Sequence, residues 1–95
     1  MSPSAALVPS SDDVLALLRA MMQAEFGLEP DAVELSKHLT DDLDLDSIDL
    51  VDLAVSLEEQ SGIKLEEEEL KSVRTVSDAV RVVHEAFARR SAGGR

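Results

Sequence analysis

The sequence predicts an all-α fold: a small four-helix bundle of three principal helices and one short helix, with a long loop between helices one and two. Three stretches repeat apolar residues at the spacing of one helix face. Each follows a residue able to cap a helix, with an acid three positions later. No stretch alternates apolar and polar residues between turn signals, so no sheet is expected. At 95 residues and 44% hydrophobic content, the chain can form one domain with a modest core.

The first helix is expected to start after Ser10, which has Asp13 three positions later as in a capping box, and to stop near Gly27. Residues 28–46 lack a sustained period and predict a long ordered connection. A loop of this length in a small domain tends to be functional, but its apolar residues can also anchor it to a helical core. We expect packing for these positions, which are Leu28, Val33, Leu35, Leu39 and Leu43.

The second helix is expected from Ser47 to about Gln60, capped by Asp46 and stopped by Ser61 and Gly62. At about 100° per residue it divides into three stripes. The stripe expected to enter the core is Leu50, Leu53, Ala54 and Leu57, and the acidic stripe is Asp49, Asp52, Ser56 and Glu59. The third stripe is Ile48, Val51 and Val55, either buried by the neighbouring loop and short helix or partly exposed to a ligand or partner.

A short third helix is expected around the acids 66–69, leading into Leu70 and Val73. Thr75 and Asp78 form a third capping pair, and the fourth helix is expected to end near Arg89 or Arg90. The folded domain is thus predicted at residues 10–88, between a flexible N-terminal segment, 1–9, and a flexible C-terminal tail, 89–95.

The net charge of −11 and the pI near 4.4 argue against nucleic acid and anionic membrane surfaces as partners, and favour basic protein partners. Residues 1–10 lack the basic start and long apolar stretch of a secretory signal, and no stretch approaches ~18 consecutive apolar residues. A cytoplasmic monomer is expected. The chain has no cysteine, so any thiol chemistry would have to be supplied from outside.

Ser47, at the start of the second helix, is the residue around which function is expected to centre. The chain has no cysteine, tyrosine or tryptophan, and no glycine-rich phosphate loop. His38 and His84 have no companion ligands, so neither is assigned a metal or a catalytic role. No histidine or lysine lies near Ser47 in sequence to activate it, so nucleophilic catalysis by the chain itself is not expected.

The segment LDLDSID, followed by V-D-L and L-E-E, resembles the prosthetic-group attachment region of acyl carrier proteins. The resemblance spans about residues 10–88, because GIKLEEEEL matches the short-helix region of that family and TVSDAV opens the last helix. Asp44 stands where many members of the family have glycine, Leu50 replaces a usually polar residue and Ser61 a frequent aromatic.

The resemblance implies that Ser47 receives 4'-phosphopantetheine from coenzyme A, through a separate magnesium-dependent phosphopantetheinyl transferase. The terminal thiol of that arm would hold acyl groups as thioesters, making the chain a carrier and not an enzyme. The implied partners are the transferase, acyl-loading enzymes, synthases and other enzymes of fatty-acid, polyketide or related biosynthesis with basic docking patches. Residues implied to meet them are Asp46, Ile48, Asp49, Asp52, Val55, Glu58 and Glu59, with Val51 and Val55 flanking the arm or its acyl group.

Two other interpretations compete with a carrier. Asp42, Asp44 and Asp46 have the one-three-five spacing of a calcium loop, but Ser47 stands at the glycine position and Leu53 at the position of the bidentate glutamate. Dedicated calcium binding is therefore not expected. The alternative function is an acidic protein-interaction domain without a prosthetic group, whose serine is incidental or phosphorylated.

Overall fold

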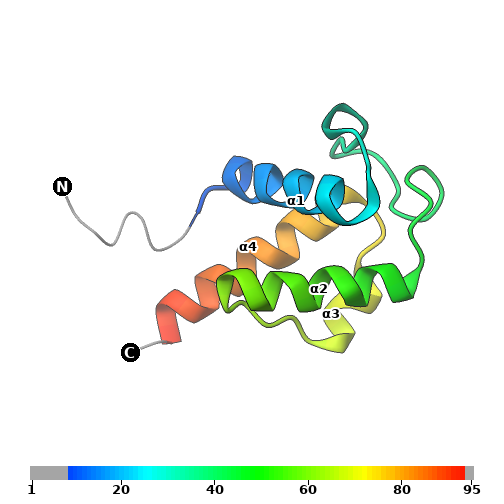
Figure 1. Cartoon of the computed structure of the whole chain (residues 1–95). Helices are drawn as coiled ribbons and strands as arrows, with labels where there is room; N and C mark the ends of the chain where they lie inside the picture. Colours follow the sequence, from blue (N-terminus) through cyan, green and yellow to red (C-terminus); the bar gives the residue numbers. More distant parts are fainter. Residues whose placement is uncertain (1–8, 94–95) are drawn as a thin grey trace.

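The protein is an all-α bundle in a computed structural model that describes residues 9–93 (Figure 1). The principal helices are α1 (Ser11–Phe26), α2 (Ser47–Ser61) and α4 (Val76–Gly93), and α3 (Glu67–Ser72) is the short one. One 3₁₀ turn, η2 (Pro30–Ala32), lies in the α1–α2 connection and was not predicted. The predicted four-helix architecture is confirmed.

The capping residues act as predicted at the start of each principal helix. The Ser10 Oγ accepts a hydrogen bond from the Asp13 N–H at 3.1 Å, and the Asp13 carboxylate accepts one from the Ser10 N–H at 3.3 Å. Thr75 and Asp78 bond reciprocally before α4. Gly27 ends α1 with φ +71°, a left-handed conformation that glycine adopts without strain.

Helix α4 is longer than predicted. It continues to Gly93, past the expected end near Arg89 or Arg90, so the first residues of the predicted C-terminal tail are helical. Arg90 donates a hydrogen bond to the Ser61 carbonyl at the end of α2. The predicted flexibility of residues 1–8 and 94–95 concerns positions outside the described part of the chain.

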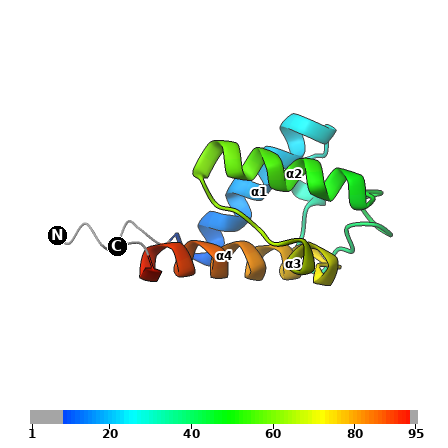
Figure 2. The same ribbon diagram turned by 90° about the horizontal axis from the view of Figure 1, so that it is seen from below.

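The core lies between α1, α2 and α4. Figure 2 shows α1 and α2 stacked on α4, with α3 beside the start of α4. Helix α1 contacts both α2 and α4, whereas α3 contacts α2. The buried core residues are Val14, Leu18, Met21, Met22, Val33, Leu39, Leu43, Leu45, Leu53, Leu57, Ile63, Val76, Val80, Val83 and Ala86.

The α1–α2 connection is fixed to the start of α4 by backbone hydrogen bonds. The Leu39 N–H donates to the Arg74 carbonyl at 2.9 Å, and the Val76 N–H donates to the Lys37 carbonyl at 3.0 Å. Between them, His38 and Thr75 form an isolated antiparallel bridge. The connection therefore gives α2 a defined starting point, at the end of the molecule opposite the start of α1 (Figure 1).

Apolar residues also anchor this connection, with one exception among those predicted. Val33, Leu39 and Leu43 are buried, but Leu35 is 48% exposed, so the prediction that Leu35 packs in the core is wrong. The Leu35 backbone carbonyl is nevertheless used, because it accepts a hydrogen bond from the Ser77 N–H. Position 35 therefore contributes to the connection through its backbone.

Candidate functional site

Ser47 is the first residue of α2, and its side chain is exposed. The preceding residue, Asp46, caps the helix: its Oδ1 accepts from the Asp49 N–H at 2.9 Å, while the Asp49 Oδ2 accepts from the Asp46 N–H at 3.1 Å. Within the described residues, the Ser47 hydroxyl makes no hydrogen bond to the protein. The capping box therefore fixes the backbone around Ser47 and leaves its oxygen accessible.

A groove of about 360 Å³ lies beside Ser47, between the first turns of α2 and helix α3. An adjoining groove of about 290 Å³ continues along α2 and shares Val51, Glu67 and Leu70 with the first. It reaches Val55 and Glu58. The residues lining the groove at Ser47 are Ser47, Ile48, Leu50, Val51, Glu67, Leu70 and Lys71.

Lys71 is the residue of this site that the sequence did not reveal. It lies 24 positions after Ser47 in the chain, and only the packing of α3 against α2 brings it to the same groove. Its Nζ is 4.0 Å from the Glu67 carboxylate, and both side chains are largely exposed. A lysine ammonium donates hydrogen bonds and accepts none, so Lys71 is no general base for the Ser47 hydroxyl.

The third stripe of α2 is exposed, which resolves the choice left open by the sequence. Ile48 is 69% exposed, and Val51 and Val55 are each 48% exposed. On the opposite stripe, Leu53 and Leu57 are buried in the core as predicted. Helix α2 thus presents an apolar surface beside Ser47 that no described part of the chain covers.

The acids predicted to meet partners fall into two groups. The carboxylates of Asp46 and Asp49 are already engaged in the capping box of α2. Asp52, Glu58 and Glu59 are exposed, and none of them takes part in an ion pair among the described residues. Asp46 and Asp49 therefore stabilise the start of α2, whereas Asp52, Glu58 and Glu59 neither cap this helix nor form an ion pair with another described residue.

The aspartates with calcium-loop spacing are arranged differently from a chelating loop. The Asp42 carboxylate accepts a hydrogen bond from the His38 N–H at 2.7 Å, and that of Asp46 caps α2. Asp44 has φ +61°, the left-handed conformation that favours glycine. Among residues 9–93, no group of three or more histidine or acidic side chains is placed to hold a metal ion.

Two carboxyl groups with lowered pKa values lie outside the Ser47 site. Hydrogen bonds from the backbone N–H groups of Arg74 and Thr75 lower the pKa of Asp78. A hydrogen bond from the Glu66 N–H is the main cause that lowers the pKa of Glu69. Both groups stabilise the starts of helices, so their shifts indicate structural roles.

The fold and the site define a small helical domain that presents one accessible serine at the start of a helix, with an exposed apolar and acidic surface beside it. No helix in the described part of the chain has both the length and the apolar character needed to cross a membrane. Comparisons with known proteins support this class and make it more specific.

Residues 16–83 match the family model described as the phosphopantetheine attachment site. The acyl carrier protein of Renibacterium salmoninarum is 44% identical over 79 residues, which cover 83% of this chain and 98% of that protein. Acyl carrier protein 2 of Ralstonia nicotianae is 43% identical over 76 residues, covering 80% and 94% of the two chains. The chain belongs to the acyl carrier protein family. Members of this family are non-catalytic carriers.

Solved structures agree with the fold. The acyl carrier protein of Thermotoga maritima aligns with a TM-score of 0.74 at 23% identity, covering 83% of this chain and 92% of that one. The acyl carrier protein of Enterococcus faecalis aligns with a TM-score of 0.66 at 26% identity, covering 82% and 99%. The arrangement of three principal helices and one short helix is thus an acyl-carrier fold.

Proposed function

We propose that Ser47 carries the 4'-phosphopantetheine arm and that the chain holds acyl intermediates on it as thioesters. The observation that carries this proposal is the exposed Ser47 hydroxyl at the first residue of α2, inside the region that matches the phosphopantetheine attachment family. The residues present fit such a group: the hydroxyl makes no hydrogen bond to residues 9–93, and a groove extends from it along α2. A helix N-terminus also favours a phosphate, because its backbone N–H groups carry partial positive charge.

The bound arm would supply a thiol, which the cysteine-free chain lacks and which forms the thioester with the cargo. In the modification step, the Ser47 oxygen forms a bond to the β-phosphorus of coenzyme A. The bond between that phosphorus and the bridging oxygen breaks, and 3',5'-adenosine diphosphate leaves. Among the residues that line the groove, the only group able to take the serine proton is the exposed Glu67 carboxylate. That carboxylate is already paired with the Lys71 ammonium on α3. The transferase is therefore expected to provide the base and the magnesium ion.

Partner enzymes are proposed to bind the exposed side of α2. Asp52, Glu58 and Glu59 attract basic patches over a distance, which speeds encounter without requiring tight binding. Ile48 is the most exposed large apolar side chain of the described residues, so it is suited to enter a partner pocket on contact. Val55 extends the same apolar surface by two helical turns. A carrier that must bind several enzymes in turn requires this combination of fast association and modest affinity.

The cargo and pathway are proposed only as a class: acyl intermediates of fatty-acid, polyketide or related biosynthesis, carried by a cytoplasmic monomer. The apolar lining of the grooves beside Ser47 supports an acyl cargo over a highly charged one. The carrier proteins similar to this chain support the same class.

The direct test is intact-protein mass spectrometry after incubation with coenzyme A, magnesium and a broad-specificity phosphopantetheinyl transferase. The native chain should gain the mass of one phosphopantetheine, and Ser47→Ala should gain none. Ser56→Ala is the matched control, because Ser56 lies on the same helix and should leave the gain unchanged. No gain on the native chain, with a control carrier modified in the same reaction, would favour the acidic interaction domain without a prosthetic group.

A further inference from the structure

The start of α2 is a strongly acidic place to receive a phosphate. Residues 38–63 contain eight acids and no lysine or arginine. Two of these acids, Asp46 and Asp49, lie at the first turn of α2, where each carboxylate accepts a hydrogen bond from the backbone N–H of the other. They already offset the positive end of the helix dipole, which amounts to roughly half an elementary charge. A phosphodiester on Ser47 adds one further negative charge, so a cation from elsewhere in the chain would stabilise it.

Lys71 is the cation that the fold brings to this place. Among the described residues that line the groove at Ser47, it is the only one with a positive charge. Its ammonium has three hydrogen-bond donors on a flexible stem of four carbons, which suits it to a phosphate oxygen. The other lysine near α3, Lys64, lines the adjoining groove and not the groove at Ser47.

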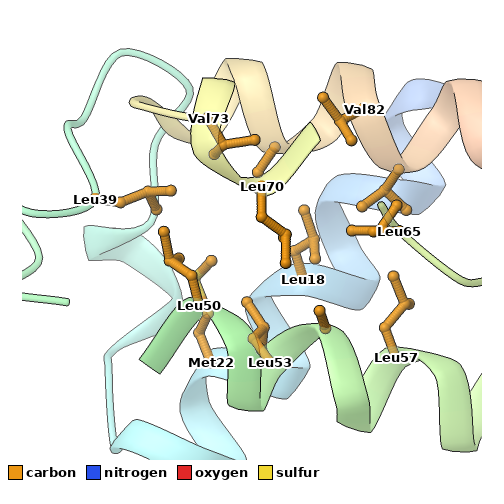
Figure 3. Close-up of a pocket in the computed structure, with 13 residues that line it drawn as sticks. Leu18, Met22, Leu39, Leu50, Leu53, Leu57, Leu65, Leu70, Val73 and Val82 are labelled. Carbon is orange, nitrogen blue, oxygen red and sulfur yellow. The ribbon is translucent and has the colours of Figure 1, made fainter. Parts of the chain in front are cut away.

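Helix α3 is held by neighbours of Lys71, which keep the lysine at the groove. Figure 3 shows Leu70 extending from α3 toward Leu53 of α2. A charged contact reaches α3 from α4, where the Arg89 Nη1 lies 3.0 Å from the Glu69 Oε2. The backbone of α3 is therefore fixed between α2 and α4, whereas the side chain of Lys71 is largely exposed and has room to turn toward the serine.

The present partner of Lys71 leaves it available. The Lys71 Nζ lies 4.0 Å from the Glu67 carboxylate, and both side chains are largely exposed. An exposed ion pair between residues four positions apart on a helix contributes little to stability. An ammonium with three donors can also keep this carboxylate and bind a phosphate oxygen at the same time. Binding a phosphate therefore costs Lys71 no strong contact.

We propose that Lys71 binds the phosphate of the 4'-phosphopantetheine arm and supplies the positive charge that the acidic start of α2 lacks. This inference rests on the proposed function of Ser47. A pair between Lys71 and the phosphate joins the last turn of α3 to the first residue of α2. Attachment of the arm then affects the stability of the folded chain through Lys71.

The first measurement is the change in melting temperature when the arm is attached. Taking this change for each variant cancels the pair with Glu67, because Lys71→Gln lacks that pair before and after attachment. At low salt the change should be lower by about 1–8 °C in Lys71→Gln than in the native chain, the range for one exposed ion pair in a domain of this size. Lys71→Arg should keep the native value, because it keeps the charge.

The matched control is Lys64→Gln, which removes an exposed lysine outside the groove at Ser47 and should keep the native value. Salt provides a second control. At about 1 M ionic strength, where the Debye length is about 3 Å, the difference between Lys71→Gln and the native chain should shrink.

The second measurement compares two lysines within the same molecule. The arm thiol is first blocked with iodoacetamide, a limiting amount of an amine-acetylating reagent is added, and peptide mass spectrometry measures acetylation at Lys64 and Lys71. Attachment of the arm should slow acetylation of Lys71 by about two- to fivefold, because an ammonium paired with an anion is less reactive. Acetylation of Lys64 should stay unchanged and serves as the internal reference.

Mass spectrometry of the same samples shows whether the arm was attached, with Ser47→Ala as the unmodified baseline. Attachment followed by equal melting changes in the native chain and Lys71→Gln would overturn the role of Lys71, and so would equal acetylation changes at Lys64 and Lys71. Either result leaves the function of Ser47 standing. A chain that gains no phosphopantetheine would overturn both the proposed function and this inference.

Discussion

Asp46 is expected to have two separable roles, and three substitutions distinguish them. Its Oδ1 caps α2 by accepting from the Asp49 N–H, and its exposed charge lies directly beside Ser47. Asp46→Asn keeps an oxygen that can cap and removes the charge. Asp46→Ala removes both. Asp52→Asn removes a charge from the same helix where no cap is involved.

The loss of stability follows from the geometry of the cap. Replacing a capping aspartate by alanine costs about 0.5–2 kcal/mol, whereas asparagine is about as good a cap as aspartate. For a domain of this size, 1 kcal/mol lowers the melting temperature by about 4–8 °C. Asp46→Ala should therefore melt several degrees lower than the native chain. Asp46→Asn should lose much less stability, because asparagine keeps the cap. It loses only the interaction of an anion with the helix dipole, which is worth ~0.3–1 kcal/mol.

The modification rate should rank the same variants differently. We expect Asp46→Asn to slow transfer of phosphopantetheine to Ser47 at low salt, because the charge contributes to encounter with a basic partner. Urea unfolding measures the stability, with Asp52→Asn as the control, because Asp52 caps no helix. Mass spectrometry at timed intervals measures the transfer, where Asp52→Asn should also be slower because Asp52 is one of the acids proposed to attract partners. If Asp46→Asn is as unstable as Asp46→Ala, the capping argument is refuted. If it is modified at the native rate at low salt, the docking role of Asp46 is refuted.

Three further predictions concern exposure, pH and salt. Ile48→Ala should change stability by less than ~0.5 kcal/mol in urea unfolding yet slow modification by the transferase, whereas Leu57→Ala, in the core, should cost about 2–5 kcal/mol. Because the pKa values of Asp78 and Glu69 are lowered in the fold, their stabilisation is present above about pH 4 and is lost as the pH falls through the folded-state values; Asp78→Asn should flatten that part of the pH–stability curve. Between residues 41 and 69 the only basic residue is Lys64, so moderate salt or magnesium should raise the melting temperature, and melting scans independent of ionic strength would contradict this repulsion.

The parts of the fold that the sequence predicted are those set by local rules. Capping pairs such as Ser10 with Asp13 act within one turn, and the left-handed Gly27 stops α1, so the starts of the principal helices and the end of α1 could be predicted. The place of Ser47 as the first residue of α2 could be predicted for the same reason, because it directly follows the capping residue Asp46. The end of α4 was placed too early, since no glycine or proline before Gly93 interrupts the helix.

The features that could not be predicted depend on contacts between distant parts of the chain. Lys71 reaches the groove at Ser47, and Arg89 reaches Glu69, only through the packing of α3. Leu35 was expected in the core because it is a leucine in a leucine-bearing loop, but its side chain is 48% exposed and only its backbone carbonyl bonds to α4. Burial of a loop residue depends on tertiary pairing, which periodicity does not encode.

The backbone hydrogen bonds between residues 35–39 and 74–77 also determine when, during synthesis of the chain, the loop before Ser47 can take its final structure. The loop that precedes Ser47 is completed only by groups from the start of α4, such as the Arg74 carbonyl and the Ser77 N–H. During synthesis at ~5–20 residues per second, the roughly 30 residues from Ser47 to Ser77 take about 2–6 s to appear. Until then Ser47 has been synthesised, but the residues at the start of α4 that hold the preceding loop in place have not. The transferase is therefore expected to modify finished chains and to leave unfinished ones unmodified.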